Sequence, residues 1–462
     1  MKKIRKILKF LLILYFLYLY IFGVLIFKVY SQGDAPFTYD ITQFTEVSNE
    51  NTYAFLVEDR ILAFSTRIAL IDEAKHSIDI SYYTIHNGTS KNIFFGALIN
   101  AANRGVKIRL IVDGLSNSKI FGNEEFKVLD LENNIDVKYY EPLNPLKPYA
   151  FNNTLHDKIM IIDEQYGLIG GRNISDRMFV EYDDSKKETY DRDVLIYGTK
   201  NYHHTVLDMK DYYDELFNHK YSKTKKIIKT EKLDNIKTRL LNAYYDYIKI
   251  ANLNEVKEYI FDNAIKVENT TFIRSPITRL NKYPVVFSTI SELSKNYDDI
   301  FIQSPYFIVN NQMRKMLPNY DNKRITILTN NIDTNPNLFA TSGYIRNRKK
   351  LASIATVYEF QSDSSLHAKT IILGDEISII GSENFDPRST FLSTESMMVI
   401  YSKDFTNHLK DEIDYYLNQS LIVEADGSYI ESDTVQPADK KRIKRTILYI
   451  ISGITFFHDE LL

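Results

Sequence analysis

The pattern of apolar and polar positions sets the first fifty residues apart from the rest of the chain. Residues 10–27 form a run of 18 uncharged, mostly apolar positions, and the nine residues before them include five basic side chains. As a helix this run is about 27 Å long, close to the hydrocarbon thickness of a bilayer. The sequence after it makes a poor signal-peptide cleavage site, so the pattern favours an uncleaved anchor. The basic flank predicts that the N-terminus stays inside and that the main domain lies on the outer face.

From residue 67 onward, stretches with helical spacing alternate with short β-branched stretches. Residues 67–85 and 92–114 each predict a helix followed by a strand, and residues 285–308 and 323–331 repeat this order later in the chain. Such alternation is typical of an α/β domain. Its recurrence predicts an α/β fold of two tandem lobes, each a mixed β-sheet flanked by helices.

The same pattern divides the chain into five segments. A Lys-rich helical stretch between the lobes is interpreted as a solvated helical face, since a charge run is more often that than a nucleic-acid site. The predicted segments are the membrane anchor 1–30, a linker 31–50, the first lobe with a helical insert 51–260, the second lobe 261–425, and a linker with a basic, apolar tail 426–462.

The tail is a second candidate membrane element. Its apolar run, residues 446–457, has 12 positions and is too short to span a bilayer. One interpretation is an interfacial segment that rests on anionic lipid. The other is a terminal helix packed on the domain, with its charges in solvent. The basic residues before the run are Lys440, Lys441, Arg442, Lys444 and Arg445.

Composition narrows the chemistry further. The chain has 462 residues, is 44% hydrophobic and 25% charged, and carries a net charge of only −3. Its length suffices for two lobes with packed cores. The near-neutral charge provides no overall attraction to nucleic acid, so we expect no nucleic-acid partner. The absence of cysteine excludes thiolate catalysis and Cys-ligated zinc.

Two copies of one motif stand 211 residues apart. Residues 155–173, LHDKIMIIDEQYGLIGGRN, align without a gap with residues 366–384, LHAKTIILGDEISIIGSEN. The alignment pairs His156 with His367, Lys158 with Lys369, Gly171 with Ser382, and Asn173 with Asn384.

The spacing has a physical meaning. Side chains two apart on a strand point to the same face, so each His projects beside its Lys. A short turn then returns the Gly-rich segment and its Asn toward the same strand. Two such sets facing each other would place two imidazoles, two ammonium groups and two amides around one tetrahedral anion. One HxK alone occurs often by chance, but two aligned sets, each ending its lobe, indicate a phosphodiester site.

This pair of motifs resembles the phospholipase D superfamily, whose mark is HxKxxxxD followed by G-G/S-x-N, twice in one chain. The chain is most similar to bacterial cardiolipin synthases, over about residues 45–425. Segments of the second lobe carry this similarity, namely IQSPYFI (302–308), LTNN (328–331), GYIRNRKKLASIATVYEF (343–360) and GSENFDPRSTFLSTE (381–395).

The resemblance implies a mechanism and roles. One His attacks phosphorus to form a phosphohistidine, and the other protonates the leaving alkoxide and then acts as base for the incoming alcohol. By analogy the nucleophile is His156 and the acid/base is His367, and no metal or cofactor is required. Oxygens of the phosphate would be held by Lys158, Lys369, Asn173 and Asn384, with the small residues Gly171 and Ser382 allowing close approach.

The family also places an acidic residue after each Gly-Asn segment, to accept a hydrogen bond from the second nitrogen of a His. Asp193 and Glu395 match those positions. The alternative for each is a surface carboxylate on a strand. Arg388, in NFDPRS, would bind lipid phosphate or brace its loop, and bracing is the favoured role.

The motif's aspartate is intact only in the first copy. Asp163 occupies it there, whereas Gly374 stands at the matching position and Asp375 falls opposite Glu164. Both positions lie where a hairpin is expected to turn, and glycine accepts a positive φ there. Asp163 is therefore kept with the catalytic motif but is expected to shape the turn rather than transfer protons.

Three functions remain open. The first is a phosphatidyltransferase that joins phospholipids into cardiolipin, with phosphatidylglycerol or phosphatidylethanolamine as donor, at a bacterial cell membrane. The second is hydrolysis of phospholipid or nucleic acid at the same site, because the motif cannot distinguish water from an alcohol as acceptor. The third is an inactive membrane scaffold, which only the shifted aspartate favours.

Overall fold

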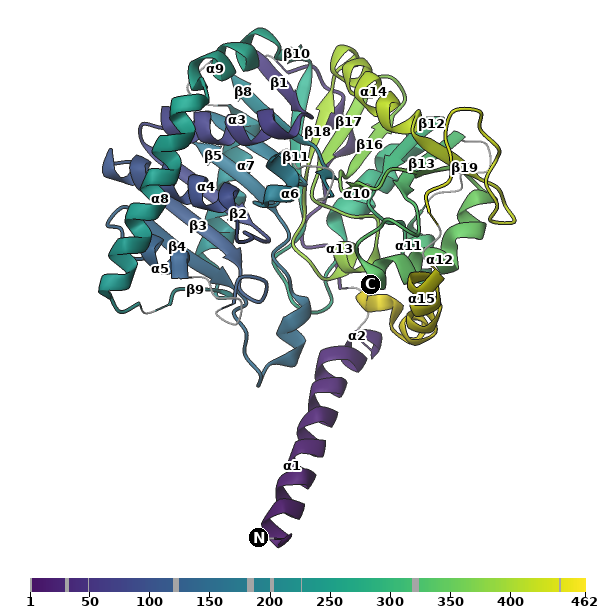
Figure 1. The fold of residues 1–462 in the computed structure, drawn as a ribbon. Helices are drawn as coiled ribbons and strands as arrows, with labels where there is room; N and C mark the ends of the chain where they lie inside the picture. The colour runs from purple at the N-terminus through teal and green to yellow at the C-terminus, as the bar shows by residue number, and fades with distance from the viewer. Residues whose placement is uncertain are drawn as a thin grey trace.

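The computed structural model describes residues 2–29, 33–48, 50–118, 124–180, 187–199, 203–225, 227–317, 324–439 and 442–462. Two β-sheets stand side by side in one body, and a long helix projects from it (Figure 1). The first sheet has nine strands in the order β10-β1-β8-β6-β5-β2-β3-β4-β9. These are β1 (Thr52–Val57), β2 (Ser77–Tyr82), β3 (Lys107–Asp113), β4 (Ile135–Tyr140), β5 (Lys158–Ile162), β6 (Tyr166–Gly170), β8 (Asp193–Gly198), β9 (Ser222–Lys223) and β10 (Ile265–Val267).

The second sheet repeats this topology. Its eight strands run β11-β18-β17-β16-β12-β13-β14-β19, which is the order of the first sheet without β10. In each sheet a parallel trio, β2-β3-β4 or β12-β13-β14, adjoins an antiparallel hairpin. The strands are β11 (Asn269–Arg274), β12 (Asp299–Gln303), β13 (Arg324–Asn330), β14 (Thr356–Phe360), β16 (Thr370–Leu373), β17 (Ile377–Gly381), β18 (Ser396–Tyr401) and β19 (Ser420–Val423).

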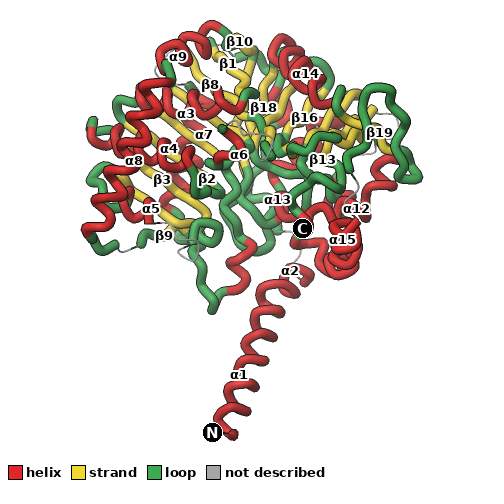
Figure 2. The backbone as a smooth tube through the Cα atoms, viewed as in Figure 1, coloured by secondary structure: helices red, strands yellow, loops and turns green. Residues whose placement is uncertain are grey.

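Helices cover both sheets (Figure 2). Strand β5 is buried along its whole length, as expected of a strand with a layer on each face. The first lobe carries α3 (Arg60–Glu73), α4 (Thr89–Asn103), α5 (Glu124–Leu129), α6 (Asp176–Phe179), α7 (His204–Asn218), α8 (Glu231–Ile250) and α9 (Leu253–Asp262). The second carries α10 (Val285–Leu293), α11 (Asn311–Met316), α12 (Leu338–Ala352), α13 (Pro387–Phe391) and α14 (Lys403–Leu417).

The two lobes share a central core. Helices α7 and α14 contribute Met209 and Leu409 to one apolar cluster that also contains Ile161 of the first sheet and Ile372 of the second. Separate clusters lie on the outer sides of the lobes. The predicted α/β fold of two tandem lobes is confirmed, and the shared core fixes the lobes relative to each other.

The insert and the lobe boundary are placed by β10. Strand β10 pairs with β1 and so belongs to the first sheet, whereas β11 pairs with β18 of the second. The lobes therefore meet near residue 268 rather than at 260. Helix α8 packs on α4 at Gly96, where an added Cβ would lie 2.1 Å from the carbonyl oxygen of Leu240. The insert is thus part of the first lobe's outer layer.

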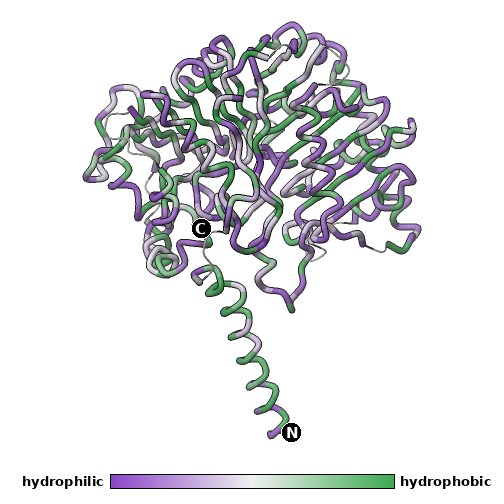
Figure 3. Tube along the Cα trace, turned by 180° about the vertical axis from the view of Figure 1, so that it is seen from behind, coloured by the Kyte–Doolittle hydropathy of each residue, from purple (hydrophilic) through white to green (hydrophobic). Residues whose placement is uncertain are grey.

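The projecting helix is the N-terminal segment. Helix α1 (Lys2–Tyr20) continues through a π-helical turn (Ile21–Leu25) into α2 (Ile26–Val29). Lys2–Lys28 is long and apolar enough to cross a membrane, and only 6% of its most apolar stretch of 18 residues is buried. In Figure 3 the tube of this helix is mostly green, for hydrophobic residues, whereas hydrophobic and hydrophilic residues mix along the tube of the body.

The tail forms α15 (Arg442–Thr455) and a short 3-10 segment (Phe456–Leu461). This helix packs against α12, next to the base of the projecting helix (Figure 1). Lys440 and Lys441, part of the basic cluster noted in the sequence, lie outside the described residues.

Candidate active site

Each motif histidine sits just before the first strand of a hairpin. His156 precedes β5, which begins at Lys158, and His367 precedes β16, which Lys369 adjoins. Hairpins β5–β6 and β16–β17 hold equivalent positions in their sheets. Both lysines are 2% exposed. Each donates to the backbone carbonyl of its own histidine, so each ammonium group lies beside an imidazole.

The backbone around each histidine pairs with the opposite lobe. Strand β15 (Ser365–Leu366) runs parallel to β7 (Thr189–Tyr190), and the His367 amide donates to the Tyr190 carbonyl at 2.7 Å. In the mirrored arrangement, the His156 amide donates to the Thr394 carbonyl at 3.2 Å. The two lobes therefore position each other's histidines.

The side chains repeat this exchange. Nδ1 of His367 lies 2.6 Å from Oδ2 of Asp191, and Nδ1 of His156 lies 3.0 Å from Oε2 of Glu395. A carboxylate on Nδ1 fixes the ring and leaves Nε2 available for chemistry. Each histidine thus receives its carboxylate from the other lobe.

Asp193 does not have the predicted role. Its Oδ2 accepts from Arg67 and Arg172, both at 2.9 Å, in a fully buried cluster. The carboxylate beside His367 belongs instead to Asp191, a residue not predicted from the motif. A signal was present, because Asp191 stands six residues before Tyr197 and Glu395 stands six before Tyr401. Aligning Tyr197 of β8 with Tyr401 of β18 would have selected Asp191.

Gly171 and Ser382, predicted to contact substrate, pack against the carboxylates instead. A Cβ on Gly171 would lie 2.2 Å from Oδ1 of Asp191, which shows how closely the backbone approaches. The Ser382 hydroxyl donates to Oε2 of Glu395 at 2.5 Å. Neither residue lines the active-site cavity. Their small size lets the carboxylates reach the histidines.

Both histidines open into one cavity of about 650 Å³. Asn173, Asn384 and Arg388 also line it. Asn384 donates to Tyr306 at 3.3 Å, and its Oδ1 is buried without a partner. Arg388 donates to the Leu461 carbonyl at 3.1 Å and to Asn152 at 3.1 Å, contacts that favour bracing. The remaining lining includes Tyr83, Thr154, Asp386, Ser389 and residues of the projecting helix and the tail.

Burial and like charge perturb the site's pKa values. Burial, with Lys158 and Lys369 nearby, holds the pKa of His156 well below its usual value. Burial and Lys369 lower the pKa of His367 to about 4, although Asp191 opposes the shift. Burial lowers the pKa of Lys158 to about 7 and that of Lys369 to about 8. Perturbations of this size are typical of functional sites.

The two carboxylates differ in ionisation. Burial raises the pKa of Glu395 to about 7, despite the lowering effect of Lys158. Burial also acts to raise the pKa of Asp191, but the charges of Lys369 and His367 outweigh it and hold that pKa well below its usual range. Asp191 is therefore ionised at neutral pH, while Glu395 is partly protonated.

The motif aspartate shapes a turn. Asp163 has a φ of 52°, and its carboxylate accepts from the amides of Lys75, His76 and Ser77 at 2.7 to 2.8 Å. Gly374 has a φ of 60°, and a Cβ there would lie 2.9 Å from the ring of Tyr297. That ring fills the space beside Gly374, which explains why the second copy lacks the aspartate. Asp375 is exposed and pairs with Lys410 at 2.8 Å.

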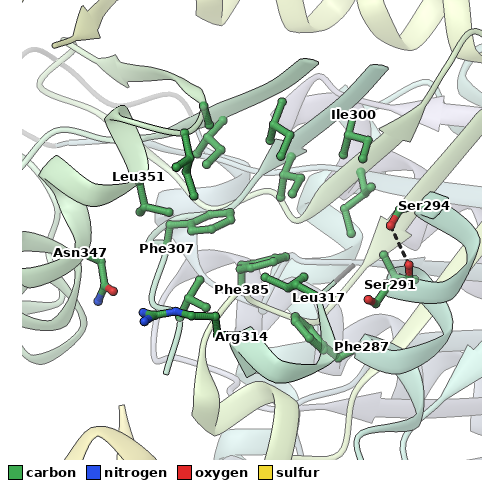
Figure 4. A pocket seen from close by; sticks show the side chains of 18 of the residues that line it. Phe287, Ser291, Ser294, Ile300, Phe307, Arg314, Leu317, Asn347, Leu351 and Phe385 are labelled. Atoms are coloured by element: carbon green, nitrogen blue, oxygen red, sulfur yellow. Dashed lines mark hydrogen bonds between the residues drawn. The ribbon is translucent and has the colours of Figure 1, made fainter. Parts of the chain in front are cut away.

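A second cavity, of about 150 Å³, lies within the second lobe (Figure 4). Its lining is almost wholly apolar. Phe307 and Phe385 stack in its wall with ring centroids 4.0 Å apart. Their chain neighbours Tyr306 and Asn384 line the active-site cavity. This largely apolar cavity therefore lies behind the wall that carries Tyr306 and Asn384, and its charged lining residues are Arg314 and Lys350.

Among the described residues, one cluster of three side chains has donor atoms close enough together to bind a metal ion. Donor atoms of Glu50, His203 and His204 lie within 4.8 Å of one another. Glu50 already pairs with His204 at 2.8 Å and with His203 at 3.3 Å. None of the three lines the active-site cavity. The arrangement is explained as a cluster of polar contacts that ties residue 50 to the start of α7.

Comparison with known proteins identifies the family. A family model described as "Cardiolipin synthase, PLD-like domain" matches residues 68–211 and 289–417, more than half of the chain. Cardiolipin synthase C of Escherichia coli (strain K12) is 27% identical over 400 residues, which cover 76% of this chain and 81% of the relative. A cardiolipin synthase of Oceanobacillus iheyensis is 24% identical over 377 residues, which cover 81% and 70%.

A solved structure agrees at the level of fold. Phosphatidylserine synthase from Haemophilus influenzae Rd KW20 superposes with a TM-score of 0.64 at 14% identity, covering 89% of this chain and 97% of that one. The resemblance inferred from the paired motifs is confirmed. The chain belongs to the cardiolipin synthase family of phospholipase D-like proteins.

Proposed function

We propose that this chain is a membrane-anchored phosphatidyltransferase that makes cardiolipin through a phosphohistidine intermediate. One observation carries the proposal: two histidines, each held at Nδ1 by a carboxylate from the opposite lobe, line a single cavity. This arrangement of histidines suits a two-step displacement at one phosphorus, in which one imidazole is the nucleophile and the other is the acid and base. A phospholipid's phosphodiester is the substrate class that the family supports.

In the first step, Nε2 of His156 attacks the phosphorus of a donor such as phosphatidylglycerol. The bond from phosphorus to the headgroup oxygen breaks, and His367 gives its proton to the departing glycerol. In the second step, His367 removes a proton from the hydroxyl of an acceptor phospholipid, whose oxygen displaces His156 from phosphorus. With two molecules of phosphatidylglycerol, the products are cardiolipin and glycerol. With phosphatidylethanolamine as donor, ethanolamine leaves instead.

The electrostatics support this division of roles. A nucleophilic imidazole must be neutral, and the pKa of His156 is held well below its usual value by burial and the two lysines. A general acid must carry a proton, and the ionised Asp191 favours the protonated form of His367. A bound phosphodiester would offset the lysine charges that now lower the pKa of His367. The His367–Asp191 pair is therefore the better acid.

The surrounding groups fit a phosphoryl centre. Lys158 and Lys369 lie beside the imidazoles and would offset negative charge that builds up in the transition state. Asn173 and Asn384 face the cavity and would bind nonbridging oxygens. The unpartnered Oδ1 of Asn384 leaves that side chain able to accept from a bound acceptor hydroxyl.

The projecting helix supports a membrane location. Lys2–Lys28 meets the length and composition of a single span, and its basic end favours an inside N-terminus with the body on the outer face. Tyr20 and Val24 of this helix line the active-site cavity. The site would therefore sit next to the bilayer that holds its substrate.

Complementation tests the proposal. Expression in a bacterium that lacks its own cardiolipin synthases should restore cardiolipin, as seen by lipid chromatography, and His156→Ala and His367→Ala should each abolish it. The matched control is Asp375→Asn, which leaves the site untouched. Well-expressed wild-type protein that yields no cardiolipin would refute the transferase. Release of phosphatidic acid from vesicles, or cleavage of a single-stranded oligonucleotide, would then identify the hydrolytic alternative.

A further inference from the structure

Helix α15 has two different faces. Leu448, Ser452 and Thr455 are buried against the body. The opposite face is apolar and exposed, and its residues follow helical spacing. They are Ile443, Ile447, Ile450 and Ile454, which are 80%, 42%, 63% and 61% exposed, and Phe456 and Phe457 continue the surface at 61% and 62%. A soluble body rarely leaves such a contiguous surface uncovered.

Polar contacts fix this orientation. Arg346 of α12 donates to the Ser452 carbonyl at 2.9 Å and to the Thr455 hydroxyl at 2.7 Å. At the other end of the helix, Arg445 pairs with Asp333 at 2.9 Å, and Lys444 donates to backbone carbonyls at 2.7 Å. These two basic residues therefore hold the tail to the body. The interpretation that the whole basic cluster rests on anionic lipid is therefore wrong for Lys444 and Arg445.

The tail lies beside the membrane helix. The ring of His458 meets that of Tyr20 edge-on, with centroids 6.0 Å apart. On another side, Asn152 donates to the Gly23 carbonyl at 2.8 Å, and Tyr18 donates to the Leu146 carbonyl at 2.6 Å. The projecting helix therefore leaves the body between the tail and the loop before Pro148–Asn152 (Figure 1).

These elements form the outer end of the active-site cavity. Its lining passes from the histidines and asparagines to the tail, where Ile454, Leu461 and Leu462 contribute, and to Tyr20, Val24 and Phe339. The cavity is thus polar at the catalytic end and largely apolar at the other. A phospholipid has the same division, with a charged phosphate and apolar chains.

The depth of this apolar end follows from the helix. Val24 lies three residues before the end of the apolar run at Phe27, or about 4.5 Å along the axis, and Tyr20 lies seven residues before it, or about 10 Å. If this helix spans, Val24 lies near the boundary between headgroups and acyl chains, and Tyr20 lies among the acyl chains. The segment that follows α15 is held at that level because its His458 contacts Tyr20.

We infer that the exposed apolar face of α15 inserts into the leaflet nearest the body and, with Tyr20 and Val24, forms the acyl-chain entrance to the active site. This inference rests on the membrane-anchored function proposed above. A short helix with one apolar face and the other face bound to protein is suited to an interfacial position. A lipid at the entrance would reach the histidines with its phosphate while its chains stay in the bilayer.

The absence of tryptophan from the chain allows a direct test. Single-tryptophan variants of the full-length protein, Ile450→Trp and Phe457→Trp, are placed in vesicles whose phospholipids carry brominated chains, which quench tryptophan on contact. Leu12→Trp reports the span itself, and Ile250→Trp, 84% exposed at the end of α8, reports the aqueous body. We expect quenching at positions 12, 450 and 457 and none at 250.

The outcomes separate the inference from the proposed function. Quenching at position 12 but not at 450 or 457, with acrylamide in the water quenching those two, would overturn the interfacial tail and leave the anchor intact. Protection of 450 and 457 from both quenchers would show that protein, such as a second copy of the chain, covers the face, and would also overturn it. No quenching at position 12 would overturn the anchor and the inference together.

A kinetic arm tests the entrance. Ile447→Glu and Ile450→Glu place charge on the inserted face without touching the catalytic groups, and Ile250→Glu is the matched control. On vesicle substrate we expect KM to rise at least tenfold for the first two variants and to stay unchanged for the third. On a short-chain phospholipid dissolved below its micelle concentration, which needs no bilayer contact, the rise in KM for the first two variants should be smaller than on vesicles, and Ile250→Glu should again match wild type. Equal kinetics for Ile450→Glu and wild type on vesicles would overturn the entrance.

Discussion

Oδ2 of Asp191 lies 2.6 Å from Nδ1 of His367, and the two residues come from different lobes. The contact joins the end of β7 in the first lobe to the start of the second motif. The reciprocal contact between Glu395 and His156 makes the arrangement symmetric. The catalytic pair therefore exists only when both lobes are folded and docked.

Asp191→Asn and Asp193→Asn should fail in different ways. The first removes the ionised acceptor on His367, and loss of such a carboxylate in a hydrolytic triad lowers kcat by roughly 10⁴-fold, so we expect a loss of about 10²-fold to 10⁴-fold with a near-normal Tm. The second leaves Arg67 and Arg172 uncompensated and buried, which costs about 3–5 kcal/mol of unfolding free energy. Kinetics and thermal unfolding of both purified variants distinguish the two roles. A normal kcat for Asp191→Asn would contradict the role of Asp191 as the functional acceptor on His367.

The two motif histidines should differ in a burst experiment. With a phosphodiester whose leaving group is nitrophenolate, the first step needs little acid catalysis, so His367→Ala should release one equivalent rapidly and then stall at the phosphohistidine. His156→Ala should show no burst because it lacks the nucleophile. Stopped-flow absorbance measures the burst, and acid-labile label on the protein confirms the adduct. The reverse pattern would exchange the two roles.

The lysines should impose an unusual pH limit. Burial lowers the pKa of Lys158 to about 7 and that of Lys369 to about 8, and each ammonium is charged only below its pKa. As pH rises from 7 to 9, the free site loses positive charge and binds an anionic phosphodiester less well, so kcat/KM should fall by about tenfold per unit for each proton lost. An ordinary lysine would sustain activity to about pH 10. Lys369→Arg, which stays charged, serves as the control. If kcat/KM of active Lys369→Arg protein still fell over the same pH range, deprotonation of Lys369 would not be the cause of that fall.

The two turn aspartates should differ in their effect on stability, and substitution of either should spare chemistry. Asp163→Ala removes an acceptor shared by three backbone amides and should lower the unfolding free energy by about 1–3 kcal/mol. Asp375→Asn removes one exposed ion pair and should leave Tm almost unchanged. Both variants should keep kcat per folded molecule. A loss of activity in folded Asp375→Asn as complete as that of His367→Ala would show that the shifted turn aims the second motif.

The sequence by itself determined the repeated motif and most of the local structure. The two-residue spacing keeps Lys158 next to His156 and Lys369 next to His367, although each histidine lies just before its strand rather than on it. The glycine at 374 likewise predicted a turn with positive φ, which the structure has. These features are local, so they follow from bonded geometry and short-range sterics.

Only the tertiary structure shows that each histidine meets a carboxylate of the other lobe. Asp191 and Asp193 are two residues apart, and both are buried, so strand periodicity cannot separate them. The choice depends on partners distant in sequence: Arg67 and Arg172 neutralise Asp193, and docking of β15 on β7 brings His367 to Asp191. The same holds for the tail, whose exposed face is set by Arg346 and Asp333 of the second lobe. Long-range packing, rather than local pattern, selects among side chains that local rules treat as equivalent.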